Sequence, residues 1–425
     1  MKLCLKRAAS LLLCAVLLIS IVGTSAFALE AEAYAGLPYK CYTYVGDSIA
    51  WGYGLDLSID TKAAESVCLR VGGSYGDAVG KVLENNNCAE VYCSASSGAR
   101  MSDFRMLIER GMGVENPYTY PDDWFGNRGA VRTRTLREKG NDICAWLSRS
   151  DLITVQVGIN DLTGALVNSL AATGVLDLEK LTAISDVKTF EDYVLSALAT
   201  VSEDPNLAGR AVSAFSGEIA GLRENSREVV RDIVALAPDT ADILLVGYHD
   251  AAQCFRVIPG LDYSLLFDLV NAALVSLNDY YFEIAAEYGN VYFVSAPDAD
   301  MIFSDGMPLT EALGNVSGIL LGVHPDAEGQ EYIAGRILDK LTEINTCRHE
   351  NTVTKYGQSA GDVGYSGVTV CRDCGQILSA GKLDTPAGQV DVPENLLSYT
   401  LKNIDSAVKS TALRIAEFFS SIFGR

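Results

Sequence analysis

The sequence predicts an α/β domain built around a parallel sheet. Five short apolar runs rich in β-branched and aromatic residues are each followed by a longer stretch that can form helix. Strands that alternate with helices in this way pair in parallel, and the helices cover both faces of the sheet. The predicted strands are Cys41–Val45, Glu90–Cys93, Leu152–Val157, Ile243–Gly247 and Val291–Val294.

The connections between the predicted strands are uneven in length. Residues 111–140 mix proline, glycine, aromatic and charged residues, which is typical of an inserted surface segment near a site. Residues 162–238 are mostly compatible with helix but too long for one crossover, so we expect at least two helices there. Apolar residues recur at three and four over Ala327–Ile344, which predicts the last helix of a domain spanning residues 40–344.

The N-terminus has the pattern of an export signal. Two lysines and an arginine precede an apolar run from Ala8 to Val22, and Ala26-Phe27-Ala28 supplies the small residues that a signal peptidase needs. We therefore expect residues 1–28 to be a cleaved signal peptide and the protein to be secreted, with cell-surface association as a further option. No later apolar run reaches the ~18 residues of a spanning helix.

Composition narrows the class of partner. The chain has 425 residues, of which 49% are hydrophobic, enough for one large α/β domain with appendages. Its net charge of -21 at pH 7 disfavours contact with a phosphate backbone. Nucleic acid is therefore not an expected partner.

Residues with catalytic chemistry follow the predicted strands. In a parallel sheet the carboxyl ends of the strands meet at one edge, where ligands bind. A serine nucleophile there needs a base that removes its proton and donors that stabilise the oxyanion. Gly98 can present an unobstructed backbone N–H, and Asn160 can donate from its amide. His324 can serve as the base for Ser48.

Four short blocks together resemble the SGNH (GDSL-type) hydrolase family. Each block alone would recur by chance, but all four occur in order and at predicted strand ends. The resemblance covers residues 40–344. The family's four named residues correspond to Ser48 in Gly46-Asp47-Ser48, Gly98 in the second block, Asn160 in Gly158-Ile159-Asn160-Asp161, and His324 in His324-Pro325.

This resemblance implies a flavodoxin-like three-layer α/β/α sandwich that hydrolyses carboxylic esters without a catalytic cofactor. Ser48 would attack the acyl carbon and form an acyl-enzyme, with His324 as general base and then general acid. The oxyanion hole would consist of the N–H groups of Ser48 and Gly98 and the side chain of Asn160. An acylated glycan and a lipid both fit as the ester. The alternative is a binding or cell-surface protein that kept the fold and lost turnover.

One position departs from the family pattern. The family usually has aspartate three residues before the histidine, and this chain has Leu321 there. A carboxylate normally holds the imidazole in its tautomer. Either a backbone carbonyl orients His324 in a Ser-His dyad, which we favour, or Asp305 or Asp326 supplies the acid. Asp326 is also placed to cap the helix that follows.

Further polar residues lie near the predicted site. His249 follows the fourth strand and either binds substrate, replaces His324 as the base, or is only a polar residue at a strand end. Asp161 is a second candidate for substrate binding. Asp47 and Asp161 are more simply explained as carboxylates that brace their turns by hydrogen bonds.

A separate cysteine-rich segment follows the predicted domain. Cys347-x-His349 and Cys371-x-x-Cys374 supply two close pairs of zinc ligands within residues 347–384. The segment resembles short Cys-x-His…Cys-x-x-Cys-Gly modules in secreted proteins of Gram-positive anaerobes, which implies a zinc-ribbon-like module with structural zinc. A disulfide within or between the pairs is the alternative. The other cysteines of the mature chain either pair or remain buried thiols, and they are Cys41, Cys68, Cys88, Cys93, Cys144 and Cys254.

Residues 392–425 predict an amphipathic C-terminal helix. Read as a helix, the segment places most of its leucine, isoleucine and phenylalanine residues near one face. Such a face either lies on a membrane or wall surface or packs on the main domain. The segment lacks the dense lysine and arginine face of a strong membrane binder, so both alternatives stay open.

Overall fold

The computed structural model describes residues 31–55, 69–120, 124–138, 140–184, 204–249, 264–295 and 324–346, single positions between 189 and 201, and three short strands between 352 and 379. Several predicted features lie outside these described residues, and those predictions stay untested. They are the signal peptide at 1–28, Asp305, Leu321, Cys347, His349, Cys374 and the helix at 392–425.

A five-stranded parallel sheet forms the centre of the fold and confirms the predicted fold class. Its strands are β1 Cys41–Gly46, β2 Glu90–Ala95, β3 Leu152–Gln156, β4 Asp242–Val246 and β5 Val291–Val294. The strand order is β2-β1-β3-β4-β5, and each neighbouring pair is parallel. This is the flavodoxin-like order, in which the chain runs from β1 to β2 on one side and then crosses to β3 on the other side of β1.

The central strands read as apolar runs because helices cover both faces of the sheet. Every residue of β1 and β3 is buried, and a strand buried on both faces has no reason to alternate apolar with polar residues. The buried threonines are satisfied by hydroxyl partners, Thr43 with Ser150 at 2.7 Å and Thr154 with Tyr42 at 2.8 Å. The runs that predicted the strands therefore form the core of the domain.

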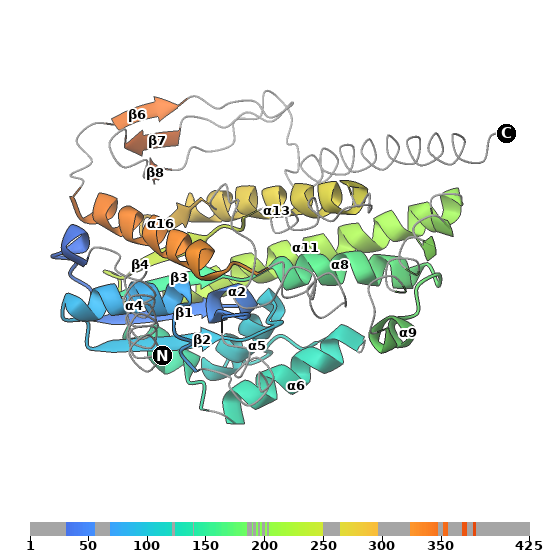
Figure 1. Ribbon diagram of the computed structural model, residues 1–425, viewed down its shortest axis with the longest axis horizontal. Helices are drawn as coiled ribbons and strands as arrows, with labels where there is room; N and C mark the ends of the chain where they lie inside the picture. Colours follow the sequence, from blue (N-terminus) through green and yellow to red (C-terminus); the bar gives the residue numbers. More distant parts are fainter. Residues whose placement is uncertain are drawn as a thin grey trace, which may run out of the picture.

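Helices cover the sheet in two groups. Their bounds are η1 Ala31–Tyr34, α2 Ser48–Trp51, α4 Tyr75–Asn85, α5 Met101–Gly111, α6 Trp124–Glu138, α7 Ile143–Leu147, α8 Ile159–Ala172, α9 Leu178–Ala183, α11 Pro205–Leu236, α13 Ser264–Ala285 and α16 Ala327–Thr346. Right-handed crossovers place the helix between β1 and β2 on the opposite face from the helices that connect the later strands. Accordingly α4 packs with α16, whereas α11 packs with α5, α8 and α13 (Figure 1).

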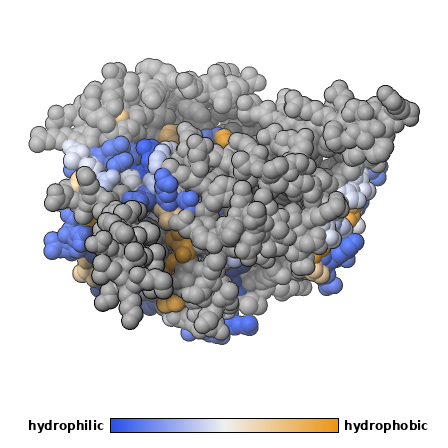
Figure 2. All heavy atoms as spheres, viewed as in Figure 1, coloured by the Kyte–Doolittle hydropathy of each residue, from blue (hydrophilic) through white to orange (hydrophobic). Residues whose placement is uncertain are grey.

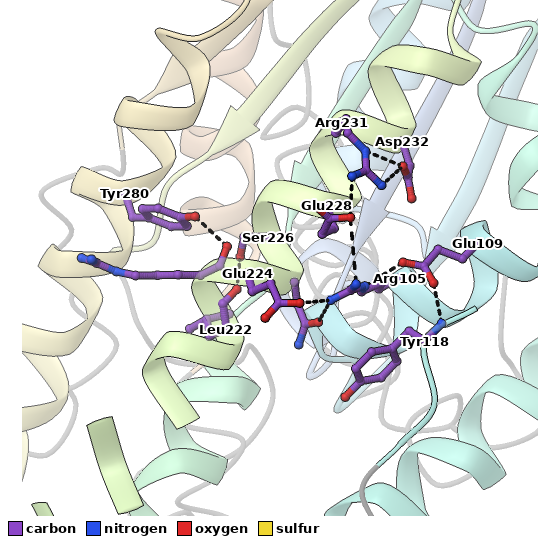
Figure 3. Close-up of polar contacts among 12 residues, drawn as sticks. Arg105, Glu109, Tyr118, Leu222, Glu224, Ser226, Glu228, Arg231, Asp232 and Tyr280 are labelled. Carbon is purple, nitrogen blue, oxygen red and sulfur yellow. Dashed lines mark hydrogen bonds and ion pairs between the residues drawn. The ribbon is translucent and has the colours of Figure 1, made fainter. Parts of the chain in front are cut away.

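The inserted segment at residues 111–140 forms α6, which packs on α5. A charged network ties the start of this segment and α5 to α11 (Figure 3). Arg105 on α5 bonds Glu109 at 2.7 Å and Glu224 on α11 at 3.0 Å. The second carboxylate oxygen of Glu109 accepts the N–H of Tyr118. The insertion is thus held against the helices beside the carboxyl end of β2.

A small antiparallel sheet follows α16 in the chain. Its strands are β6 Thr352–Lys355, β7 Val368–Cys371 and β8 Ile377–Ser379, in that order. The first pair sets Thr352 beside Cys371. Cys371 is the predicted zinc ligand that falls within the described residues, and its side chain is buried. Because the other three ligands lie outside them, the zinc site stays a prediction.

Four cysteines of the main domain carry thiols and take part in no disulfide. They are Cys41, Cys88, Cys93 and Cys144. Burial raises the pKa of Cys41, Cys93 and Cys144 to about 11, so these thiols stay protonated near neutral pH. For these four residues the thiol alternative holds, and the other two candidates for pairing lie outside the described part of the chain.

The described surface is mainly hydrophilic on the face shown in Figure 2, with hydrophobic residues in a few small areas. Its exposed large hydrophobic side chains are Leu69, Met112, Val114, Val275, Phe282 and Tyr332. Within the ranges that the structure describes, no helix is long and apolar enough to cross a membrane.

Candidate active site

Ser48 lies at a strand-to-helix turn. β1 ends at Gly46, Asp47 caps the one-turn helix α2, and Ser48 is the first residue of that helix. The Asp47 carboxylate accepts the N–H of Ile49 at 2.9 Å. A Cβ on Gly46 would lie 2.1 Å from the Cβ of Ala50. Only glycine therefore permits the tight turn that brings Ser48 to the end of the sheet.

His324 is brought to Ser48 from the far end of the domain. Its Nε2 lies 2.8 Å from Ser48 Oγ, which is hydrogen-bond distance for a nucleophile and its base. The ring of Tyr53 packs on the imidazole, with centroids 4.9 Å apart, and the Tyr53 N–H donates to the Ser48 carbonyl at 2.9 Å. His249 is buried after β4. The histidine whose hydrogen bond to Ser48 is described is therefore His324.

Gln330 ties the helix that follows His324 to the nucleophile's helix. Its Nε2 donates to the Ile49 carbonyl at 3.0 Å, and its Oε1 accepts the N–H of Tyr75 at 2.9 Å. These bonds join α16 to α2 and α4 and satisfy a side chain that is fully buried. Gln330 is not among the residues that the sequence predicts, because a glutamine within an amphipathic helix usually faces solvent.

Asp326, one of the two acids considered for orienting His324, caps α16. Its Oδ1 accepts the N–H of Gly329 at 2.8 Å, which is the capping role that its position in the sequence also allows. The other acid, Asp305, and Leu321 at the family's aspartate position lie outside the described residues.

The strands on either side of β1 end at the same level as Ser48. The Asp47 N–H donates to the Gln156 carbonyl on β3 at 3.1 Å. The Ser96 N–H, just after β2, donates to the Gly46 carbonyl at 3.1 Å. The loop that carries Gly98 and the first turn of α8, which carries Asn160, therefore lie next to the turn that carries Ser48.

The predicted oxyanion donors have hydrogens available at these positions. Within the described residues, neither the Ser48 N–H nor the Gly98 N–H donates a hydrogen bond. Asn160 Nδ2 donates to the Ala99 carbonyl at 3.0 Å, which orients the amide and leaves its second hydrogen for another acceptor. Gly98 has a φ of 72°, a left-handed conformation that suits glycine, and the guanidinium of Arg132 lies over it.

Asp161 joins the starts of α8 and α5. Its Oδ2 accepts the N–H of Met101 at 3.0 Å. Burial raises the pKa of Asp161 to about 7, whereas the Met101 N–H and the nearby Arg100 guanidinium lower it. This contact is a bracing hydrogen bond, and substrate binding by Asp161 stays a prediction.

Tyr248, which adjoins His249, is a further residue near Ser48 that the sequence does not predict. Its hydroxyl donates to Asp47 Oδ2 at 2.5 Å, and both side chains are buried. Burial raises the pKa of Asp47 to about 7, while the bonds from Tyr248 and Ile49 lower it. Tyr248, two residues after the end of β4, thus supports the turn that presents Ser48.

Replacing Tyr248 by phenylalanine should destabilise the protein more at high than at low pH. Below pH 7 the lost bond is to a neutral carboxyl group, and above pH 7 it is to a buried carboxylate, whose hydrogen bonds are stronger. We expect the free energy of unfolding in urea to fall by about 1 kcal/mol at pH 5 and by about 2–3 kcal/mol at pH 9.

The matched control is Tyr34→Phe, which removes a tyrosine hydrogen bond to the exposed Asp339. It should cost less than about 0.5 kcal/mol. In the wild type, the folded pKa of Asp47 exceeds that of unfolded aspartate, so its contribution to stability falls as pH rises from about 4 to 7. A loss in Tyr248→Phe that is equal at both pH values would contradict the assignment.

Among known proteins, the chain is similar to several solved structures. No protein-family model matches the chain, and no curated protein matches it. An extracellular lipase from Streptomyces rimosus is 17% identical, with a TM-score of 0.39 over 70% of this chain and 97% of that chain. A phospholipase A1 from Streptomyces albidoflavus NA297 is 17% identical, with a TM-score of 0.39 over 71% of this chain and 99% of that chain.

A putative GDSL-like lipase from Parabacteroides merdae is 15% identical, with a TM-score of 0.28 over 71% of this chain and 94% of that chain. The chain is similar to lipases, one of them described as GDSL-like, which is the family type that its four sequence blocks resemble.

Proposed function

We propose that this chain is a secreted serine esterase of the SGNH type that hydrolyses carboxylic esters through an acyl-enzyme on Ser48. The observation that carries the proposal is the 2.8 Å contact between His324 Nε2 and Ser48 Oγ at the carboxyl end of β1. The open N–H groups of Ser48 and Gly98 and the oriented amide of Asn160 support it. A turn serine without these neighbours would have no base and no oxyanion donors.

In the proposed reaction, His324 Nε2 takes the proton of the Ser48 hydroxyl as Oγ attacks the acyl carbon. The tetrahedral oxyanion accepts hydrogen bonds from the two N–H groups and from Asn160 Nδ2. The intermediate collapses to the acyl-enzyme, and the leaving alcohol takes the proton from His324. Water, activated by His324 in the same way, then releases the acid and restores the Ser48 hydroxyl.

We favour a Ser-His dyad. Asp326 is engaged as the cap of α16, while Tyr53 packs on the imidazole and Gln330 anchors the helix that follows it. The aromatic packing restricts the ring and the Gln330 bond restricts its helix, and neither of these two contacts uses a carboxylate. Asp305→Ala with full activity would support the dyad, and loss of activity in that variant would assign the third member to Asp305.

The ester is either a lipid or an acylated glycan. The inserted segment at residues 111–140 borders Gly98 through Arg132, so this segment and its connections shape the substrate pocket. Contact of the C-terminal segment with a membrane or cell wall is part of the same proposal. The rival function is a binding protein without turnover, which the departure at Leu321 motivates.

A serine-reactive fluorophosphonate tests the proposal directly. We expect the probe to label the wild type and to leave Ser48→Ala unlabelled, because phosphonylation needs an activated hydroxyl. Asp326→Asn, which keeps an N-cap side chain, should be labelled if the dyad is correct. Absence of labelling in wild-type protein with normal thermal unfolding would favour the binding protein over the esterase.

A further inference from the structure

Arg132 of the inserted helix α6 lies over Gly98, at the edge of the proposed oxyanion hole. A Cβ built on Gly98 would lie 2.9 Å from Arg132 Nη2, 3.6 Å from Cζ and 3.9 Å from Nε. The Nη2 and Nε edge of the guanidinium therefore faces Gly98, whose N–H would hold the oxyanion. Arg132 is not among the site residues that the sequence predicts.

Asp103 holds Arg132 in this place. The Asp103 carboxylate is fully buried and pairs with Arg132 Nη1. It also accepts the hydroxyl of Tyr120 at 2.6 Å and the backbone N–H of Arg100 at 3.0 Å. Because its oxygens are bonded from α5, α6 and the loop between them, Asp103 fixes the orientation of the guanidinium.

The local charge is positive. Asp103 is shared by two guanidinium groups, since Arg100 Nη2 lies 3.8 Å from it. Asp161 close by is only partly ionised at neutral pH, because burial raises its pKa to about 7. The whole chain carries a net charge of -21, which repels anions in general. The positive charge at the edge of the site is therefore local and contrasts with the acidic chain as a whole.

Arg132 also keeps unused donors. Its side chain is 21% exposed, and among the residues that the structure describes neither Nη2 nor Nε has a hydrogen-bond acceptor. A guanidinium presents its donors in a planar fork, so one Nη can pair with Asp103 while the other Nη and Nε bind a second oxyanion group. A mostly buried cation with open donors is a costly arrangement unless a ligand completes it.

We propose that Arg132 binds a negatively charged oxygen group, a carboxylate or a phosphate, carried by the ester close to its scissile carbonyl. The substrates of the site are then anionic esters. This inference rests on the proposed function, because it places the group relative to Ser48 and Gly98. It adds a substrate class and a specificity-determining residue to that function.

Two matched pairs of esters test the substrate class. The first is 4-nitrophenyl hemisuccinate against 4-nitrophenyl butyrate, which differ by a carboxylate on the acyl side. The second is lysophosphatidate against the monoacylglycerol with the same acyl chain, which differ by a phosphate on the alcohol side. We expect Arg132→Gln to lower the ratio of kcat/KM for the anionic to the neutral ester about 10–100-fold in one pair, and that pair identifies the source of the charge.

The matched control is Arg134→Gln on the same helix. Arg134 has a 67% exposed side chain paired with Glu138, so this variant removes the same charge from α6 and should leave both ratios unchanged. Arg132→Lys keeps a cation for Asp103 but lacks the planar fork, so it should keep the fold and still lose most of the preference. Ratios that stay unchanged in both Arg132 variants overturn the inference.

A binding experiment separates this inference from the proposed esterase. Titration of the four esters into Ser48→Ala, which cannot form an acyl-enzyme, measures affinity without turnover. We expect tighter binding of one anionic ester than of its neutral partner, and a loss of about tenfold or more when Arg132→Gln is added. If the fluorophosphonate does not label the wild type but an anionic ester still binds more tightly than its neutral partner, the esterase is rejected and the role of Arg132 is kept. Labelling with no preference for either anionic ester rejects the role of Arg132.

Discussion

Alanine at Ser48 or at His324 should lower kcat for ester hydrolysis roughly 10⁴–10⁶-fold. Each change removes one partner of the 2.8 Å contact between Oγ and Nε2. Because the nucleophile and its base act as a unit, the double variant should be hardly slower than either single variant. Steady-state hydrolysis of a 4-nitrophenyl ester, with active protein counted by fluorophosphonate labelling of the wild type, measures the effect.

The controls for this prediction come from the same chain. Ser148→Ala removes an exposed hydroxyl that bonds the Ala145 carbonyl on α7, and it should leave kcat unchanged. His249→Gln tests the other histidine of the domain, which is buried after β4. Full activity in His324→Ala together with its loss in His249→Gln would reverse the assignment of the base.

Alanine at Asn160 should lower kcat about 10²–10³-fold and change KM much less. The Asn160 amide donates one hydrogen to the Ala99 carbonyl, so its other hydrogen is held ready without reorganisation when the oxyanion forms. Such a donor acts in the transition state more than in the ground state, which places the loss in kcat. Steady-state kinetics with one neutral ester provide both constants.

Asn168→Ala is the matched control for Asn160. Asn168 lies on the same helix α8, and its amide donates to Glu218 on α11 at 3.2 Å. This variant removes a side-chain amide that has no contact with the proposed site and should leave both constants unchanged. A rise in KM with unchanged kcat in Asn160→Ala would assign Asn160 to ground-state substrate binding.

Local sequence pattern determined the strands and the residues that follow them. The predicted runs match β1 to β5 within two residues at each end, because a strand covered on both faces must be apolar throughout. Strand ends are marked by glycine and small polar residues, and parallel pairing brings those ends to one edge. Ser48, Gly98 and Asn160 were therefore predictable from their positions after the strands.

The local pattern also predicted that Asp326 could cap the last helix and that this helix ends at Ile344, and the helix is observed to end at Thr346. It did not predict roles for Tyr248, Gln330 or Arg132. Nothing in the residues next to these three signals a function, since each reads as an ordinary polar or aromatic residue of a helix or strand end. Their roles appear only with their partners.

By itself the sequence determined the fold class, the order of the four blocks and the serine that we propose as the nucleophile, because hydrophobic periodicity and short motifs are properties of neighbouring residues. Only the tertiary structure decided what holds those residues in place. Asp47 meets Tyr248 across 201 positions, and Gln330 meets Ile49 across 281. Such contacts depend on how the crossovers stack helices on the sheet, and no local pattern encodes which side chains then meet.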